Sequence, residues 1–241
     1  MTKKGLGDMA KIKIMSAGAV QSMVTQLGNE FAKAKGHEID FNFATVGALR
    51  ERLAGGETTD LAVLSESAIA ALAKSGLFVP GSIKNLGRTR TGVVIREGAA
   101  KPDISTPEAF KRALLNARVV SYSDPKGGGS SGTFFAGLLE RLGIADEVNK
   151  TAVLKKRGFE VAQAVVSGEA DIGTTFISEI LTVKGAVVAG PLPAELDNAN
   201  TYTAAVFANS TQRDGAAALL AALSDPAGRG RWTAAGLEPA F

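Results

Sequence analysis

The sequence predicts an α/β protein built as two lobes, each a mixed, mostly parallel sheet flanked by helices, with a ligand cleft between them. Successive strand-turn-helix units occupy residues 11–72, and this alternation is typical of a parallel sheet covered by helices. A longer β run interrupts the pattern near residues 88–96, and the pattern changes back after residue 192. At 241 residues the chain also exceeds the usual size of one hydrophobic core. We expect lobe 1 to hold residues 11–87 and 193–241, lobe 2 residues 88–192, and a tail residues 1–10.

The elements of lobe 1 follow from hydrophobic period and from turn residues. The β run Lys11–Met15 precedes a small-residue turn and a helix whose apolar residues 20, 23, 24, 27 and 31 share one face. The strand Ile39–Ala44 leads into a helix that Gly55 and Gly56 end. The strand Asp60–Leu64 then precedes a helix through Leu72.

The elements of lobe 2 repeat the same alternation. Thr106 as N-cap and Pro107 in the first turn predict a helix to Leu115. The segments that follow are a strand at 118–122, a helix from the glycine-serine run to Leu142, a strand at 152–154, a helix at 160–166 and a strand at 171–175. The β run 202–208 is expected to return the chain to lobe 1, where helices over 212–223 and 224–241 close the fold.

Composition excludes several function classes. The chain has no Cys and one His, His37, so thiolate catalysis, a His-based triad and a multi-histidine metal site cannot be assembled. A net charge of +3 with scattered basic residues, two Tyr and one Trp gives little support to nucleic-acid binding. The tight basic cluster Lys155–Arg157 is interpreted as a solvated turn, with anion attraction as the alternative.

The sequence predicts no membrane insertion, because no run approaches the roughly 18 apolar residues of a membrane-spanning helix. Residues 1–10 are polar and Gly-rich and carry no apolar core of an export signal. We therefore expect no signal peptide in the chain as given, which leaves a cytoplasmic location open.

The functional prediction depends on turns that follow parallel strands. Ligands of such sheets bind outside the carboxyl ends of the strands, where helix N-termini offer unpaired N–H groups and partial positive charge. Turns of small and hydroxyl residues occur at Ser16–Ala19, Thr45–Gly47, Ser65–Ser67 and Lys126–Thr133. The sequence therefore predicts a small anionic ligand, with the glycine-serine run 126–133 as the clearest candidate contact.

The glycine-serine run is not a nucleotide loop. Gly127 and Gly132 have the glycine spacing of a Walker A motif, but Thr133 occupies the position that the motif gives to lysine. Ser130, Ser131 and the neighbouring N–H groups are instead expected to bind an anion at a helix start.

No arrangement of residues predicts catalysis. Asp124, Glu179 and Glu66 are possible carboxylate bases, but each has an ordinary role as a turn former or a helix-start charge. Arg50 either pairs with a carboxylate ligand or lies on a solvated helix face. We expect no catalytic residue, no cofactor and no metal.

Motifs in order along nearly the whole chain resemble a known family. They are Ser16–Val20, Phe43–Leu49, Asp60–Leu64, the Asp124–Pro125 turn, Ser167–Gly173 and Leu223–Pro226. The chain resembles the type II periplasmic solute-binding proteins, most closely the molybdate-binding components of ABC transporters. The resemblance implies two α/β lobes that are joined by two strands and close over an oxyanion, neutral hydroxyl and N–H donors, a periplasmic location and delivery to a membrane permease. We expect a monomer.

Several positions differ from the family pattern. Ala19 and Thr45–Val46 stand where serines are usual, and Phe176 stands where a tyrosine is typical. The glycine-serine run is longer and richer in hydroxyls than the family's form, which makes a small organic carboxylate a candidate beside an oxyanion. The alternative function is an isomerase of a small polycarboxylate, similar to aconitate isomerase, with Glu179, Lys126 or a serine as the base.

The expected ligand contacts are taken from the turns and from the resemblance together. They are Ser16, Ala17, Gly18, Ala19, Thr45, Val46, Gly47, Arg50, Ser65, Ser130, Ser131, Gly132, Thr133, Phe176 and Ser178.

Overall fold

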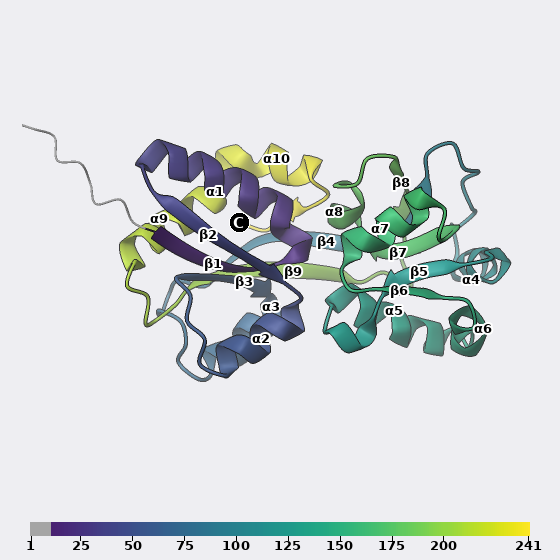
Figure 1. Ribbon diagram of the computed structural model, residues 1–241, viewed down its shortest axis with the longest axis horizontal. Helices are drawn as coiled ribbons and strands as arrows, with labels where there is room; N and C mark the ends of the chain where they lie inside the picture. The colour runs from purple at the N-terminus through teal and green to yellow at the C-terminus, as the bar shows by residue number, and fades with distance from the viewer. Residues whose placement is uncertain (1–10) are drawn as a thin grey trace, which may run out of the picture.

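Two α/β lobes lie side by side along the long axis of the molecule in the computed structural model, which describes residues 11–241 (Figure 1). The expected tail at residues 1–10 lies outside the described residues. The predicted fold class is confirmed: both lobes consist of a sheet with helices on its faces.

The sheet of the first lobe has the strand order β2-β1-β3-β9-β4. Strands β1 to β3 are parallel, as the strand-turn-helix alternation predicted, while β9 and β4 are antiparallel to their neighbours. The strands are β1 (Lys11–Ala17), β2 (Glu38–Ala44), β3 (Leu61–Ser65), β4 (Lys84–Arg96) and β9 (Ala199–Val206). The helical segments are η1 (Gly18–Val20), α1 (Gln21–Lys35), α2 (Val46–Ala54), α3 (Glu66–Ala73), α9 (Arg213–Leu223), η3 (Pro226–Gly228) and α10 (Arg229–Ala234).

The sheet of the second lobe continues from the far end of β4. Its strand order is β4-β7-β5-β6, and β8 also pairs with β4. The strands are β5 (Val120–Ser123), β6 (Val153–Lys155), β7 (Ile172–Phe176) and β8 (Ala186–Pro191). The helical segments are α4 (Pro107–Asn116), η2 (Pro125–Gly127), α5 (Ser130–Arg141), α6 (Ala145–Asn149), α7 (Gly158–Ser167) and α8 (Ile177–Ile180).

Strand β4 belongs to both sheets. Its first half, to Arg90, pairs with β9, and its second half, from Thr91, pairs with β7 and β8. The chain returns through β9, whose first residue, Ala199, pairs with Arg90. Two neighbouring strands therefore connect the lobes. The boundaries at residues 88 and 193 stay a prediction.

Both sheets bury apolar side chains on each face, which is typical of sheets covered by helices on both sides. In the first lobe, one cluster packs around Ile12, Ile14 and Trp232 and another around Leu49 and Leu64. These layers hold the carboxyl ends of β1 to β3 at one edge and so position the turns that follow them.

The C-terminal segment differs from the prediction. A helix was expected over residues 224–241, but α10 ends at Ala234 and a short strand, β10 (Glu238–Pro239), pairs with β4. Gly236 adopts a left-handed conformation with φ of 75°, which ends the helix and redirects the chain. The short helices α6 and α8 were also missed, because so few residues carry no readable helical period.

Candidate ligand-binding site

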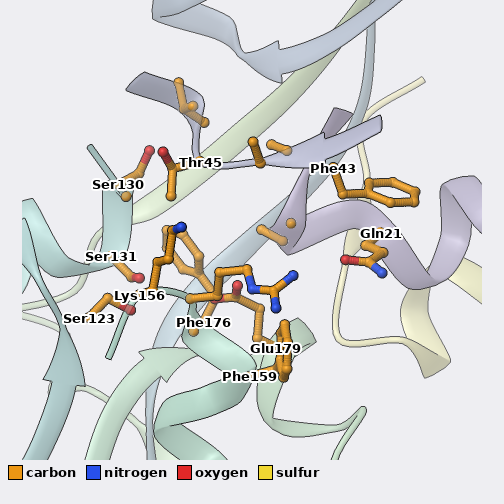
Figure 2. Close-up of a pocket in the computed structure, with 18 of the residues that line it drawn as sticks. Gln21, Phe43, Thr45, Ser123, Ser130, Ser131, Lys156, Phe159, Phe176 and Glu179 are labelled. Atoms are coloured by element: carbon orange, nitrogen blue, oxygen red, sulfur yellow. The ribbon is translucent and has the colours of Figure 1, made fainter. Parts of the chain in front are cut away.

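A pocket lies between the two lobes, at the carboxyl ends of the strands. The free space is ≈ 40 Å³ for the centres of water-sized spheres, enough for about three waters. Its lining residues are Ala17, Gly18, Ala19, Gln21, Phe43, Ala44, Thr45, Val46, Ser123, Gly129, Ser130, Ser131, Lys156, Arg157, Gly158, Phe159, Phe176, Glu179 and Tyr202 (Figure 2).

The wall from the first lobe carries no charged side chain, and small residues and Thr45 make up much of it. Ala17 ends β1, and Gly18 and Ala19 begin the short helical turn that follows. Thr45 is the N-cap of α2, and its Oγ1 accepts a hydrogen bond from the Ala48 N–H (3.3 Å). The same hydroxyl donates to the Gly127 carbonyl of the second lobe (2.7 Å). Its one proton is therefore committed to the protein.

The two lobes touch through a pair of glycines. The Gly47 N–H donates to the Gly128 carbonyl (3.0 Å), and a Cβ added to Gly47 would lie 2.8 Å from the Cα of Gly128. Gly128 has a left-handed φ of 70°, which favours glycine. This contact, with the Thr45–Gly127 hydrogen bond, holds the lobes together at one rim of the pocket.

The second lobe contributes hydroxyl groups at the start of α5. Ser130 and Ser131 are the first residues of that helix, after Gly129 as N-cap, so free backbone N–H groups accompany the two side chains. Figure 2 shows Ser123 and Ser131 on the same side of the pocket. The Ser123 Oγ is buried and has no hydrogen-bond partner among the described residues, which leaves it free for a ligand.

Two cationic side chains line the pocket where β6 passes into α7. Lys156 and Arg157 both lie on its wall, whereas Lys155 points elsewhere and pairs with Glu169 (2.7 Å). The Arg157 guanidinium is held by Glu160 (3.1 Å) and lies 4.6 Å from the ring centre of Phe159. The basic cluster therefore brings two positive charges to the pocket.

Glu179 is a buried carboxyl on the pocket wall. Its side chain comes from α8 and is 8% exposed. The Thr175 hydroxyl donates to its Oε2 (2.9 Å). Burial raises the pKa of Glu179 to about 7, against the opposing effect of hydrogen bonds from Thr175 and from the backbone of Gly158 and Phe176.

Tyr202 of β9 completes the floor. Burial raises the pKa of its hydroxyl well above the usual range, and the neighbouring Glu179 carboxylate raises it further. Near pH 7 the Tyr202 hydroxyl is therefore neutral and the Glu179 carboxyl is partly neutral. No group of three or more acidic or histidine side chains that could hold a metal ion occurs in residues 11–241.

Comparison with known proteins identifies the family. A family model described as bacterial extracellular solute-binding protein matches residues 12–238. The chain belongs to this family. It is a solute-binding protein. No helix in residues 11–241 is both long and apolar enough to cross a membrane.

Individual relatives of this solute-binding protein carry two kinds of name. Aconitate isomerase from a Pseudomonas species is 29% identical over 237 residues, which cover 95% of this chain and 87% of that protein. The molybdate-binding protein ModA of Mycobacterium tuberculosis is 28% identical over 220 residues, which cover 90% of this chain and 80% of that protein. Among solved structures, the periplasmic molybdate-binding protein of Azotobacter vinelandii has a TM-score of 0.75 at 20% identity, with 94% of this chain and 98% of that chain covered, and so shares the fold.

The pocket of this solute-binding protein collects about half of the contacts expected from sequence. Those on its wall are Ala17, Gly18, Ala19, Thr45, Val46, Ser130, Ser131 and Phe176. Gly47, Arg50, Ser65 and Thr133 instead line a separate hollow beyond the Gly47–Gly128 contact. That contact divides what the sequence suggested would be one site.

Three expected contacts are buried away from the pocket. Ser16 donates from Oγ to the Ala17 carbonyl (3.3 Å) and is fully buried. Gly132 packs against Ser123, where a Cβ would overlap the carbonyl, so its role is close packing of α5 on β5. Ser178 is 2% exposed and faces the protein interior.

The sequence missed contacts that only tertiary packing brings to the pocket. They are Gln21, Phe43, Ala44, Ser123, Gly129, Lys156, Arg157, Gly158, Phe159, Glu179 and Tyr202. The Lys155–Arg157 cluster was a usable signal, since it follows a strand and precedes a helix. Glu179 was considered from the sequence only as a possible base, because an ordinary role as a turn former or helix-start charge explained it equally well.

Proposed function

We propose that the interlobe pocket binds a small anion, and that a small organic carboxylate is the ligand. The observation that carries the proposal is that Lys156 and Arg157 line the same closed pocket as Ser123, Ser130 and Ser131. Guanidinium and ammonium groups form strong charge-assisted hydrogen bonds with carboxylates. Hydroxyls and the start of α5 supply further donors.

The charge balance of the pocket supports an organic anion over molybdate. The resemblance implies a molybdate site of neutral donors, but Phe176 lacks the hydroxyl typical of that position, and the Thr45 proton is given to Gly127. Two cations stand in their place, Lys156 and an Arg157 that also pairs with Glu160, and the pocket wall carries one carboxyl, Glu179, that is partly neutral near pH 7. A carboxylate ligand is the anion that such a donor set favours.

Membership of an extracellular solute-binding family supports a transport role. In this proposal the protein captures its ligand outside the cytoplasmic membrane, and the closed two-lobed form delivers it to an ABC permease. Closure is expected to involve the two strands that connect the lobes, β4 and β9.

A thermal-shift panel tests the ligand class. Molybdate, tungstate, sulfate, phosphate, citrate, the two aconitates and tricarballylate are each added to the protein, and titration calorimetry follows any shift. A ligand at 100 times its Kd stabilises the folded state by about 2.7 kcal/mol, which a melting curve resolves. We expect the largest shift from a carboxylate. The largest shift from molybdate would overturn the carboxylate proposal, and no shift with any anion would overturn anion binding.

A second candidate function is isomerisation of a small polycarboxylate by proton transfer. The observation that favours it is Glu179: of the bases considered from sequence, this carboxyl lines the pocket, while Lys126 is exposed and does not. A pKa of about 7 suits a group that both accepts and returns a proton. The relative at 29% identity is named aconitate isomerase.

Proton NMR in D₂O tests the isomerase candidate directly. The protein is incubated at high concentration with cis-aconitate, and a Glu179→Gln variant serves as the control. Conversion to the trans isomer, or loss of proton signal by exchange, in the wild type alone would support isomerisation. Absence of both would remove this reaction and leave binding as the function.

A further inference from the structure

Glu179 forms part of the wall between the interlobe pocket and an outer hollow. The residues lining the hollow include Ser22, Thr25 and Thr182, and it shares Gly18, Gln21, Phe159 and Glu179 with the pocket. One carboxyl therefore borders the ligand space on one side and, on the other, a hollow that opens between α1 and α8.

The two oxygens of Glu179 have different surroundings. Oε2 accepts from Thr175 and lies beside the backbone of Gly158, where any Cβ would overlap it. Oε1 faces Gly18 of the first lobe, since a Cβ added there would lie 3.6 Å from it. Backbone N–H groups of Gly158 and Phe176 also bond the carboxyl, but among the described residues no side chain donates to Oε1, so Oε1 is the oxygen that faces the first lobe.

The charged and titratable groups around Glu179 come from two directions. Tyr202 faces it from β9, and Lys156 and Arg157 lie on the pocket wall where β6 meets α7. Besides Tyr202, the first lobe presents the neutral Gly18 and Gln21. Within residues 11–241 no cation forms an ion pair with Glu179, and the Arg157 guanidinium pairs with Glu160 instead. A buried carboxyl without a cationic partner is costly to ionise.

We propose that Glu179 takes up a proton when an anion enters the pocket and then donates a hydrogen bond to it from Oε1. The inference rests on the proposed anion binding and adds a specificity residue to it. A ligand carboxylate beside an ionised Glu179 would place like charges together in a closed pocket, which strongly disfavours the ionised form. The neutral carboxyl removes the repulsion and supplies a donor, and the outer hollow gives solvent protons access while the lobes are closed.

The proposal predicts a specific dependence of affinity on pH. Below the pKa of the free carboxyl, about 7, the proton is already present and affinity is flat. Above it, each pH unit weakens binding by about tenfold until the pKa of the complex is reached, because binding must take up one proton. A pocket that recognises its ligand only through Lys156, Arg157 and hydroxyls has no such slope in this range.

Titration calorimetry measures the proton directly. The probes are trans-aconitate and molybdate, which do not themselves titrate between about pH 6.5 and about pH 9. Binding heats at about pH 8 are compared in HEPES and Tris, whose different ionisation enthalpies reveal the number of protons taken up. We expect about one proton for the wild type, none for Glu179→Gln, and a pH-independent Kd in that variant. Glu147→Gln, an exposed carboxyl on α6 paired with Lys150, is the matched control and should behave as the wild type.

The outcomes separate this inference from the function on which it rests. If neither probe binds at any pH, and no other anion of the panel does, the proposed function fails. If a probe binds without taking up a proton, Glu179 stays ionised in the complex, as a base would. The proposed function then stands, and the proposed role of Glu179 is overturned. Uptake that persists in Glu179→Gln also overturns it. Should that variant fail to fold, the buffer comparison on the wild type and Glu147→Gln still decides whether a proton is taken up.

Discussion

The two walls of the interlobe pocket are built from different chemistry. The first lobe presents uncharged residues, among them Ala17, Gly18 and Ala19 and a threonine, Thr45, whose hydroxyl is already bonded across the cleft. The second lobe presents serine hydroxyls, of which Ser123 Oγ has no partner among the described residues, together with two cations and a buried carboxyl. Small side chains let backbone approach a ligand closely but carry no charge. The first wall therefore sets shape, and the second sets which charge is accepted.

The contact between the lobes involves the first wall, which sets the shape of the pocket. Gly47 and Thr45 meet Gly127 and Gly128 through two hydrogen bonds that involve no ligand. Because these bonds form within the protein, part of the closed form is stabilised before binding. Substitutions on the two walls should then have separable effects: loss of charge recognition on one side and loss of fit on the other.

The largest effect is expected from removing a charge on the second wall. Lys156→Met should weaken binding of the preferred anion by about 2 kcal/mol, roughly 30-fold, because a charge-assisted hydrogen bond is lost. Lys155→Met is the matched control, since its ammonium pairs with Glu169 outside the pocket. Titration calorimetry gives both values.

The same calorimetry also tests Arg50, a charged residue of the first lobe. Arg50→Met should leave affinity nearly unchanged, because Arg50 lines the separate hollow beyond the glycine contact. A loss in Arg50→Met as large as that in Lys156→Met would break the contrast between the walls and extend the site into that hollow.

A smaller effect is expected from the shape-setting side. Gly47→Ala places a Cβ 2.8 Å from the Gly128 Cα, and this overlap should force the lobes apart and weaken anion binding by about 1 to 2 kcal/mol, the usual scale of overpacking. The melting temperature should change little, because the first turn of α2 tolerates Ala.

Gly137→Ala controls for the substitution itself, since a Cβ there meets nothing within 4 Å. Small-angle scattering should show Gly47→Ala to be less compact than this control. Unchanged affinity and unchanged compactness in Gly47→Ala would mean that the glycine contact does not help to close the pocket.

Serine hydroxyls of the two lobes should also differ in how much they contribute to affinity. Ser123→Ala should weaken binding by about 1 kcal/mol, roughly fivefold, without loss of stability, because Ser123 Oγ has no partner among the described residues. Ser16→Ala should leave affinity unchanged, since its hydroxyl donates to the Ala17 carbonyl. Calorimetry and melting curves on the pair check both statements. Equal affinity in the two variants would remove Ser123 from the site.

The elements that form the first wall could be predicted because they are local. Alternating β runs and helix periods fixed where β1 to β3 end, and the carboxyl ends of parallel strands share one edge. The turns with Ala17–Ala19 and Thr45 then follow from the order of elements alone. The extra β10 was missed because its pairing with β4 depends on where Gly236 turns the chain.

The chemistry of the second wall could not be predicted in the same way. Which of Lys155, Lys156 and Arg157 face the pocket depends on the end of β6 and the start of α7 at Gly158. The burial of Glu179 depends on α7, β7 and β9 packing around a helix of four residues. Likewise, the division of the predicted site into two hollows results from one contact between distant segments, at Gly47 and Gly128. These features depend on tertiary packing, and no local pattern in a single sequence predicts them.

The smallest expected effect concerns stability and contrasts one carboxyl from each lobe. Hydrogen bonds from Arg52 and then Lys13 lower the pKa of Glu57 from 4.5 to about 2, so its contribution is present above about pH 4.5 and is lost as pH falls toward 2. Burial raises the pKa of Glu179 to about 7, so the unliganded protein should lose stability as pH rises from about 4.5 to about 7. Melting temperatures across this range should show Glu57→Gln removing the acid-side loss and Glu179→Gln removing the loss toward neutrality. Since Glu57 is 34% exposed, solvent screening makes its effect the weaker one. The assigned environments would be contradicted if both substitutions changed the dependence of melting temperature on pH in the same direction.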